Sequence, residues 1–451
     1  MARTDLVFKA YDIRGIYPSQ IDEELCRAIG SAVATFAGVE RILIARDMRP
    51  SGPSLVEAFA QGARSAGTAV VDLGMASTDF LYYAAGALDA PGAMFTASHN
   101  PAQYNGIKLC LAGAKPIGRD TGLTEIQALT ERFLVEPASG PLAATSSQDL
   151  LSAWADHVRS FVDVSALRPL KVVADTANGM GGLVVPLVME GLGFDVEILY
   201  PELDGNFPNH PADPIQEENL VDLKRRVLET GADIGLAFDG DADRVFLVDE
   251  QAEGVSGSLT TAMVAASMLD KNPGATVLYN LICSKTVAEV IAEHGGTGVR
   301  TQVGHSFIKQ VMAETGAVFG GEHSGHYYFK DNFRADSGII TALIVLELMS
   351  KRGQSLSEIV APYRRYIASG EINTEVADPA GAVAAVAKAL EGSEAQLDQL
   401  DGLTVSYPDW WYNLRPSNTE PLLRLNVEAA DEAACSAHVA QVLKLVAELT
   451  A

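Results

Sequence analysis

Positive charge is scarce in this sequence. Its 451 residues include 33 Lys and Arg against 58 Asp and Glu, which gives a formal net charge of −25 at pH 7. Such an acidic chain repels polyanions, so we expect neither nucleic acid nor an anionic membrane among its partners. A phosphorylated small molecule would have to bind where the few cations are concentrated.

Cysteines and long apolar runs are also few. The four cysteines lie far apart, without CxxC or Cys/His spacing, which argues against a thiolate metal site: Cys26, Cys110, Cys283 and Cys435. We expect buried free thiols in a reducing cytoplasm. The first residues lack the apolar stretch of a secretory signal. The longest apolar run, residues 339–349, contains Glu347 and is too short for a membrane span, so it predicts a buried helix.

The length and the repeating pattern of the chain predict several α/β domains. A chain of 451 residues is too long for one core, and about three or four domains are expected. Strand-like runs alternate with helical patterns, as at residues 41–45, 54–66 and 70–73, which is typical of parallel sheets. A smaller final unit ends in an amphipathic helix at about residues 434–449. Candidate boundaries are three polar or Pro/Gly-rich stretches at residues 137–149, 250–258 and 368–379.

The most informative run is Asp-Gly-Asp-Ala-Asp-Arg at residues 239–244, between two strand-like segments. Its three carboxylates repel one another strongly if they are partly buried. Asp239, Asp241 and Asp243 alternate with small residues, so a tight loop can turn them toward one point. A divalent cation that prefers oxygen ligands is a suitable counter-charge, and Mg²⁺ with a position left open for a phosphate oxygen fits best.

Two other interpretations of this run are a solvated turn, which stays open, and a calcium loop, which the sequence does not fit. Acidic runs of this kind are often solvated turns. A calcium loop of the EF-hand type would match the three aspartates and Glu250 at position twelve, but Arg244 stands at position six, where that loop needs Gly. An EF-hand loop also lies between helices, whereas strand-like segments flank this run.

Three further runs carry groups suited to phosphosugar chemistry. Residues 96–101, Thr-Ala-Ser-His-Asn-Pro, follow a strand-like segment and place Ser98 where open α/β sheets bind ligands. Residues 321–326, Gly-Glu-His-Ser-Gly-His, offer groups that hydrogen-bond sugar hydroxyls. Residues 415–421, Arg-Pro-Ser-Asn-Thr-Glu-Pro, offer a guanidinium, hydroxyls and backbone N–H groups for a dianionic phosphate. Taken singly, each run is equally typical of a polar turn.

In this order and at these separations, the four runs resemble the α-D-phosphohexomutase superfamily, most closely its phosphomannomutase/phosphoglucomutase branch. The resemblance extends from residues 8–15, Phe-Lys-Ala-Tyr-Asp-Ile-Arg-Gly, to residue 421. It implies three similar α/β domains with mixed, mostly parallel sheets and a smaller C-terminal α+β domain, around a central cleft. We place the domains at residues 1–145, 146–254, 255–369 and 370–451.

The resemblance also implies roles for individual residues. Ser98 would be carried as phosphoserine and would donate and accept the phosphoryl group. Asp239, Asp241 and Asp243 would bind Mg²⁺ together with the phosphoserine. The other catalytic residues implied are Arg14, Lys108, Arg244 and His305. The substrate-binding residues implied are Tyr11, Glu322, Ser324, His326, Arg415, Ser417, Asn418 and Thr419.

The implied reaction interconverts mannose 6-phosphate and mannose 1-phosphate through a hexose 1,6-bisphosphate, which also acts as activator. His305, Lys108 and Arg14 are the candidate bases. Ile282 replaces a lysine of some bifunctional relatives, and His323 replaces the Met or Gln of other branches. These differences favour mannose phosphates, with activity on glucose phosphates in addition. A phosphoglucomutase, a phosphoglucosamine mutase and a non-catalytic phosphosugar-binding protein are the alternatives, and both a monomer and a dimer are open.

Overall fold

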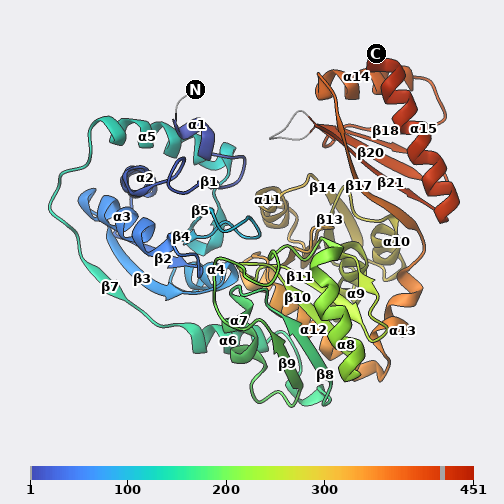
Figure 1. Cartoon of the computed structure of the whole chain (residues 1–451), viewed down its shortest axis with the longest axis horizontal. Coiled ribbons are helices and arrows are strands. Elements are labelled where there is room, and N and C mark those ends of the chain that lie inside the picture. The colour runs from blue at the N-terminus through green and yellow to red at the C-terminus, as the bar shows by residue number, and fades with distance from the viewer. Residues whose placement is uncertain (1–2, 417–421, 451) are drawn as a thin grey trace.

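The computed structural model describes residues 3–416 and 422–450, apart from the side chains of residues 305 and 450. The described chain forms four sheets, one after another along the sequence (Figure 1). The first three combine parallel and antiparallel strands, and the fourth is entirely antiparallel. This architecture agrees with the predicted fold class.

The first unit is built on a sheet of order β1-β5-β4-β2-β3-β7, with β6 beside β5. Strands β4, β2, β3 and β7 run parallel, and β5 and β1 are antiparallel to their neighbours. Its strands are β1 (Ile13–Ile16), β2 (Arg41–Arg46), β3 (Ala69–Met75), β4 (Gly92–Phe95), β5 (Tyr104–Leu111), β6 (Lys115–Pro116) and β7 (Thr145–Ser147). Its helices are α1 (Arg3–Val7), α2 (Glu23–Ala37), α3 (Gly52–Ser65), α4 (Thr78–Ala87) and α5 (Leu123–Val135).

The second unit carries a sheet of order β12-β11-β10-β8-β9, in which β10, β8 and β9 are parallel. Antiparallel β10 and β11 form a hairpin, and the acidic run is its connecting loop. The strands are β8 (Lys171–Asp175), β9 (Asp195–Leu199), β10 (Ile234–Phe238), β11 (Val245–Asp249) and β12 (Gly254–Val255). The helices are α6 (Leu151–Arg159), α7 (Gly181–Met189) and α8 (Val221–Thr230).

The third unit has a sheet of order β14-β13-β15-β16, parallel except for the last strand. The Gly-Glu-His-Ser-Gly-His run connects β15 to β16. The strands are β13 (Thr276–Asn280), β14 (Thr297–Thr301), β15 (Phe319–Gly321) and β16 (Tyr327–Phe329). The helices are α9 (Gly257–Lys271), α10 (Lys285–Glu293), α11 (His305–Thr315), α12 (Gly338–Arg352) and α13 (Leu356–Val360).

The fourth unit is an antiparallel sheet of order β17-β21-β20-β19-β18, with two helices packed on one face. Its strands are β17 (Ile367–Glu375), β18 (Gln396–Asp398), β19 (Leu403–Ser406), β20 (Trp411–Pro416) and β21 (Leu422–Ala429). Its helices are α14 (Pro379–Ala389) and α15 (Glu432–Thr450). Most of the candidate boundary stretch at residues 368–379 is strand rather than loop, because it belongs to β17. The polar side chains of this strand concealed it, but its backbone pairs with β21.

One hydrophobic core runs through the first three units. Phe80 of α4 and Trp154 of α6 meet edge to face across the first two units, with ring centroids 6.0 Å apart. The predicted helix at residues 339–349 is confirmed as α12, and its apolar residues are buried in this core. The fourth unit has a hydrophobic core of its own, and the first unit has a second core besides the shared one. Figure 1 shows the fourth unit at one end of the molecule.

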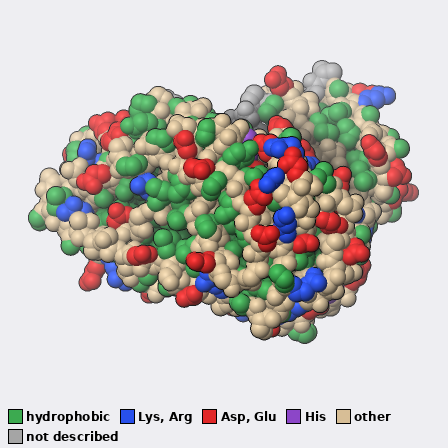
Figure 2. Space-filling model, turned by 60° about the horizontal axis from the view of Figure 1, so that its bottom comes forward, with side chains coloured by type: hydrophobic (Ala, Val, Ile, Leu, Met, Phe, Trp, Pro, Cys, Tyr) green, Lys and Arg blue, Asp and Glu red, His purple; other side chains and the backbone are tan. Residues whose placement is uncertain are grey.

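On the face drawn in Figure 2, acidic side chains do not gather into one dominant patch. Figure 2 shows Asp and Glu side chains distributed over this face with Lys and Arg among them. The four cysteines are confirmed as buried and free. Among the described residues, no helix combines the length and apolarity needed to cross a bilayer.

Candidate active site

Ser98 lies in the loop after β4 and touches the acidic run of the second unit. Its hydroxyl donates a hydrogen bond to Asp239 Oδ2 at 2.8 Å, and only 4% of the residue is exposed. Its φ of 50° is in the left-handed region, which L-residues adopt at a cost of about 1–2 kcal/mol. A Cβ on Gly240 would lie 2.4 Å from the Ser98 carbonyl oxygen, so only glycine allows the two loops to approach this closely.

The three aspartates of the β10–β11 loop converge as predicted. Asp239, Asp241 and Asp243 are each at most 1% exposed, and one oxygen from each lies within 4.8 Å of the others. Ala242, between the last two, has a φ of 59°, which gives the loop its sharp turn. The structure therefore contains a buried acidic group that could hold a metal ion.

Two cations reach this group from different directions. Lys108 of β5 places its Nζ 2.7 Å from Asp241 Oδ2 and 2.6 Å from Asp243 Oδ2. Arg244 donates from Nε to Asp239 Oδ2 at 2.9 Å. The first unit thus supplies one of the cations that neutralise the acidic loop of the second.

Burial and charge separate the pKa values within the cluster. Burial raises the pKa of Asp239 to about 7, against the opposing charge of Arg244. Burial also acts to raise the pKa of Asp241, but Lys108 and the hydroxyl of Thr78 outweigh it and hold this pKa below its ordinary value. Burial opposes the charge on Lys108, yet the two carboxylates beside it raise its pKa well above the usual value.

The donor set fits a hard divalent cation. The Oδ1 atoms of Asp241 and Asp243 are buried and have no hydrogen-bond partner within the described part of the chain. Buried carboxylate oxygens are costly without a partner, and Mg²⁺ takes such oxygens as ligands. The geometry therefore accommodates a cation beside the Ser98 hydroxyl.

Arg14 and Tyr11 connect the N-terminal run to two other parts of the site. Arg14, on β1, donates from Nη1 to Asn100 Oδ1 at 2.6 Å. It thereby contacts residues 96–101, here called the serine loop. Tyr11 donates its hydroxyl to the Val303 carbonyl at 2.9 Å. Burial raises the pKa of Tyr11, and the negative charges of Asp401 and Glu322 act in the same direction.

Glu322 lies in the turn of residues 321–326, here called the sugar loop, and side chains from two neighbouring strands hold it in place. Glu322 is 1% exposed and accepts hydrogen bonds from the Tyr328 hydroxyl at 2.5 Å and from Asn280 Nδ2 at 3.0 Å. Ser324 is half-buried in the same turn. Tyr328 is fully buried and helps to orient this carboxylate.

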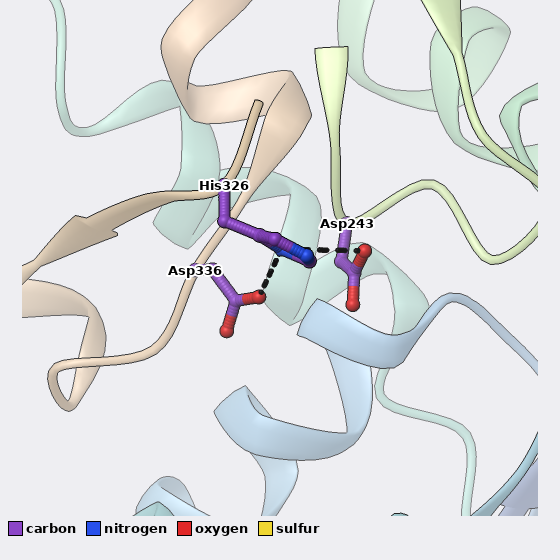
Figure 3. Close-up of side chains that lie close together, drawn as sticks. All are labelled: Asp243, His326 and Asp336. Carbon is purple, nitrogen blue, oxygen red and sulfur yellow. Dashed lines mark hydrogen bonds and ion pairs between the residues drawn. The ribbon is translucent and has the colours of Figure 1, made fainter. Parts of the chain in front are cut away.

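His326 joins the sugar loop to the acidic loop. Its Nδ1 lies 3.0 Å from Asp336 Oδ2 and 3.8 Å from Asp243 Oδ1, as Figure 3 shows. The fully buried Lys309 pairs with the other Asp336 oxygen at 2.7 Å. Asp336 thereby holds the imidazole beside the acidic cluster.

The run at residues 415–421, here called the phosphate loop, lies only in part within the described residues. Arg415 donates from Nη2 to Glu371 Oε2 at 2.9 Å. Ser417, Asn418 and Thr419 lie outside the described residues, and so does the side chain of His305, whose backbone begins α11. The predicted roles of these four residues stay predictions.

The two departures from the family pattern line one cavity. Ile282 and His323 face a space of about 320 Å³ between the third and fourth units, together with Trp411 and Asn426. Burial lowers the pKa of His323, and its Nδ1 lies 3.0 Å from the Ser258 hydroxyl. Trp411 and its neighbours Trp410 and Tyr412 are buried.

Sequence reasoning missed several residues of this site. Thr78, at the start of α4, donates to Asp241 Oδ2 at 2.6 Å. Arg49, after β2, donates from its guanidinium to four backbone carbonyls in and just after the serine loop. The polar Asp-Met-Arg run after an apolar strand was a usable signal for Arg49. For Thr78, Lys309 and Asp336 the sequence carried no comparable signal.

Comparison with known proteins agrees with this geometry. Family models for phosphoglucomutase/phosphomannomutase match in order: alpha/beta/alpha domain I at residues 5–133, domain II at 152–254, domain III at 256–366 and the C-terminal domain at 371–445.

Named relatives extend over nearly the full length. A Xanthomonas campestris pv. campestris protein named "Phosphohexose mutases" is 41% identical over 429 residues, covering 95% of this chain and 96% of that protein. A phosphomannomutase from Salmonella montevideo is 40% identical over 449 residues, covering 97% and 98%. A solved phosphoglucomutase/phosphomannomutase family protein from Burkholderia thailandensis has a TM-score of 0.90 at 32% identity, covering 99% and 97%. On these four domain matches and full-length relatives, this chain belongs to the phosphoglucomutase/phosphomannomutase family, and it is an enzyme of the phosphohexomutase type.

Proposed function

We propose that this enzyme interconverts mannose 6-phosphate and mannose 1-phosphate through a phosphoserine at Ser98 and a hexose 1,6-bisphosphate, and also accepts glucose phosphates. The supporting observation is the 2.8 Å contact between the Ser98 hydroxyl and Asp239, inside an acidic cluster that Lys108 and Arg244 partly neutralise. Relatives named phosphomannomutase and phosphomannomutase/phosphoglucomutase support the substrate class.

The proposed step exchanges one phosphorus–oxygen bond for another. The bond between phosphorus and Ser98 Oγ breaks with its electron pair left on Oγ, while a sugar hydroxyl oxygen bonds to phosphorus and loses its proton to a base. The candidates for this base are His305, Lys108 and Arg14. Because its raised pKa keeps Lys108 protonated, Lys108 better serves to stabilise charge on the transferring group.

Asp239, Asp241 and Asp243 would hold Mg²⁺ together with an oxygen of phosphoserine 98. When bound, the cation withdraws charge from the phosphoryl group. Arg244 orients Asp239 through its Nε hydrogen bond, and Thr78 fixes one Asp241 oxygen. These contacts leave the Oδ1 atoms of Asp241 and Asp243 available, since no hydrogen bond reaches them from the described residues.

The sugar must present either of two positions to one phosphoserine, which requires recognition groups away from Ser98. We assign the ring hydroxyls to Glu322, Ser324 and His326. We assign the phosphate that is not transferred to Arg415, Ser417, Asn418 and Thr419. Tyr11 would bind substrate near the phosphoserine. The hexose 1,6-bisphosphate would turn over between these groups and would also recharge Ser98.

Domain boundaries near residues 145, 254 and 369 stay our proposal, and they would give each recognition element a unit of its own. The first and the last of them fall within strands, β7 (Thr145–Ser147) and β17 (Ile367–Glu375). We assign the reaction to the cytoplasm, where buried free thiols such as the four of this chain persist.

Relative turnover tests the proposal. Purified enzyme should show higher kcat/KM with mannose 1-phosphate than with glucose 1-phosphate, with measurable activity on both. Ser98→Ala should abolish turnover while mannose 1-phosphate still binds. Near-normal turnover in Ser98→Ala contradicts the phosphoserine, and a preference for glucosamine 1-phosphate contradicts the substrate assignment.

A further inference from the structure

Arg49 lies between β2 and α3 with a fully buried guanidinium. All five of its N–H groups donate hydrogen bonds. Nη2 donates to the Ser98 carbonyl at 2.9 Å and to the Asn100 carbonyl at 2.7 Å. Nη1 donates to the carbonyls of Pro101 and Tyr104, both at 2.9 Å. Nε donates to Asp47 Oδ2 at 3.2 Å.

Through these contacts one side chain binds four backbone carbonyls of a short segment, residues 98–104. The loop carries Ser98 in a left-handed conformation that is unfavourable by itself, and such strain persists only where the surroundings enforce it. The Ser98 carbonyl lies between Nη2 of Arg49 and the backbone of Gly240, where a Cβ would approach it to 2.4 Å. The serine backbone is therefore fixed from both sides at the point where Oγ meets Asp239.

Stability alone does not account for this arginine. Burying a charge is costly, and apolar residues of similar volume often replace buried ion pairs without loss of stability. An apolar side chain, or a lysine with three donors, could fill the space but could not reach four carbonyls and a carboxylate. The feature that only arginine provides is the geometry of the loop.

The second unit contacts the same arginine. A Cβ on Gly205 would lie 2.6 Å from Arg49 Cα, and the Phe207 ring centroid lies 5.2 Å from its guanidinium carbon. Gly205 and Phe207 belong to the loop that follows β9. Arg49 is thus held between the loop it positions and a loop of the neighbouring unit.

We propose that Arg49 is a positioning residue for phosphoryl transfer: it presents Ser98 to the acidic cluster and touches no substrate. This inference rests on the proposed function. It requires that loss of the arginine slows transfer to and from Ser98 and leaves substrate affinity nearly unchanged, because the sugar-reading groups lie on other loops.

The first test replaces Arg49 by lysine. Arg49→Lys should lower kcat with mannose 1-phosphate by about 100-fold, with KM within about threefold, because small misplacement of reacting groups has effects of this size. Phosphorylation of Ser98 by mannose 1,6-bisphosphate, followed by intact-protein mass spectrometry, should slow by the same factor. The matched control is Arg159→Lys. Arg159 also holds backbone carbonyls, those of Leu187, Val188 and Glu190, but far from Ser98 in sequence and on α6. Its kcat should stay within about threefold of wild type.

A second variant acts on Arg49 without removing it. Gly205→Ala places a methyl group against the Arg49 backbone, and Gly205 has no positive φ that would make alanine strained by itself. We expect kcat to fall by about 10-fold or more at nearly constant KM. Gly298→Ala, on the exposed edge strand β14, is its control and should be neutral.

The outcomes separate the two proposals. If wild-type protein neither turns over hexose phosphates nor accepts phosphate on Ser98, the proposed function is wrong. If wild type is active and Arg49→Lys keeps its kcat, or loses activity only through KM, the positioning role is refuted. Should Arg49→Lys fail to fold, Gly205→Ala decides: an unchanged kcat refutes the role, and a selective loss of kcat supports it.

Discussion

Replacing Lys108 by methionine tests the electrostatic basis of the site. The ammonium group lies 2.7 Å from Asp241 and 2.6 Å from Asp243, and only 7% of its side chain is exposed. Methionine keeps much of the volume of the stem but leaves the buried carboxylates without this cation. Breaking a buried pair in this way typically costs about 3–5 kcal/mol. We expect a loss of that size in unfolding free energy at pH 7 in EDTA, measured from the first transition in urea.

Added Mg²⁺ should reduce this deficit, because a bound cation supplies the missing counter-charge. The variant should therefore gain more stability from 10 mM Mg²⁺ than wild type does. Lowering the pH should reduce the deficit as well. Lys108 holds the pKa of Asp241 below its ordinary value, so its contribution is complete above pH of about 4 and is lost as the pH falls toward the lowered folded value.

Lys271→Met is the matched control. Lys271 also pairs with a buried carboxylate, Glu347 Oε2 at 2.9 Å, but it is 39% exposed and Glu347 keeps Lys351 as a partner. Its removal should cost no more than about 1 kcal/mol and should not respond to Mg²⁺. A Lys108→Met deficit below about 1 kcal/mol, or one that Mg²⁺ leaves unchanged, would refute the reasoning.

Three further changes test other contacts of the site and of the second unit. Gly240→Ala would bring a Cβ to 2.4 Å from the Ser98 carbonyl oxygen. We expect kcat to fall by about 100-fold and the unfolding free energy to fall by about 1–3 kcal/mol. Unchanged kinetics would show that the two loops need not touch. Asp241→Asn should lose most activity and its Mg²⁺ dependence, and an unaltered Mg²⁺ titration counts against this ligand. His210 has a raised pKa because its bond and charge interaction with Asp175 outweigh burial. The stabilisation by His210 should be complete below pH of about 6 and should disappear as the pH rises through the raised pKa. Urea unfolding of wild type and His210→Gln from pH 5 to 9 measures this. A stability difference that does not change with pH contradicts the prediction.

Local pattern was sufficient for much of the fold. The apolar run at residues 339–349 predicts α12, and the strand–loop–strand pattern around the acidic run predicts the β10–β11 hairpin. Strand β17 was missed because its side chains are largely exposed and polar, and its place depends on pairing with β21, some fifty residues away.

For the site, the sequence determined the chemistry of each loop: a hydroxyl at a strand end, three alternating carboxylates, and a carboxylate-hydroxyl-imidazole turn. These properties reside in neighbouring residues, so spacing alone reveals them. Only the tertiary structure decided that Lys108 neutralises Asp241 and Asp243, and that Arg49 holds the Ser98 loop. Both sets of contacts join segments far apart in the chain. The Arg49 contacts depend on how the first sheet brings its loops together, and the Lys108 contacts depend on how the first two units pack around a shared core.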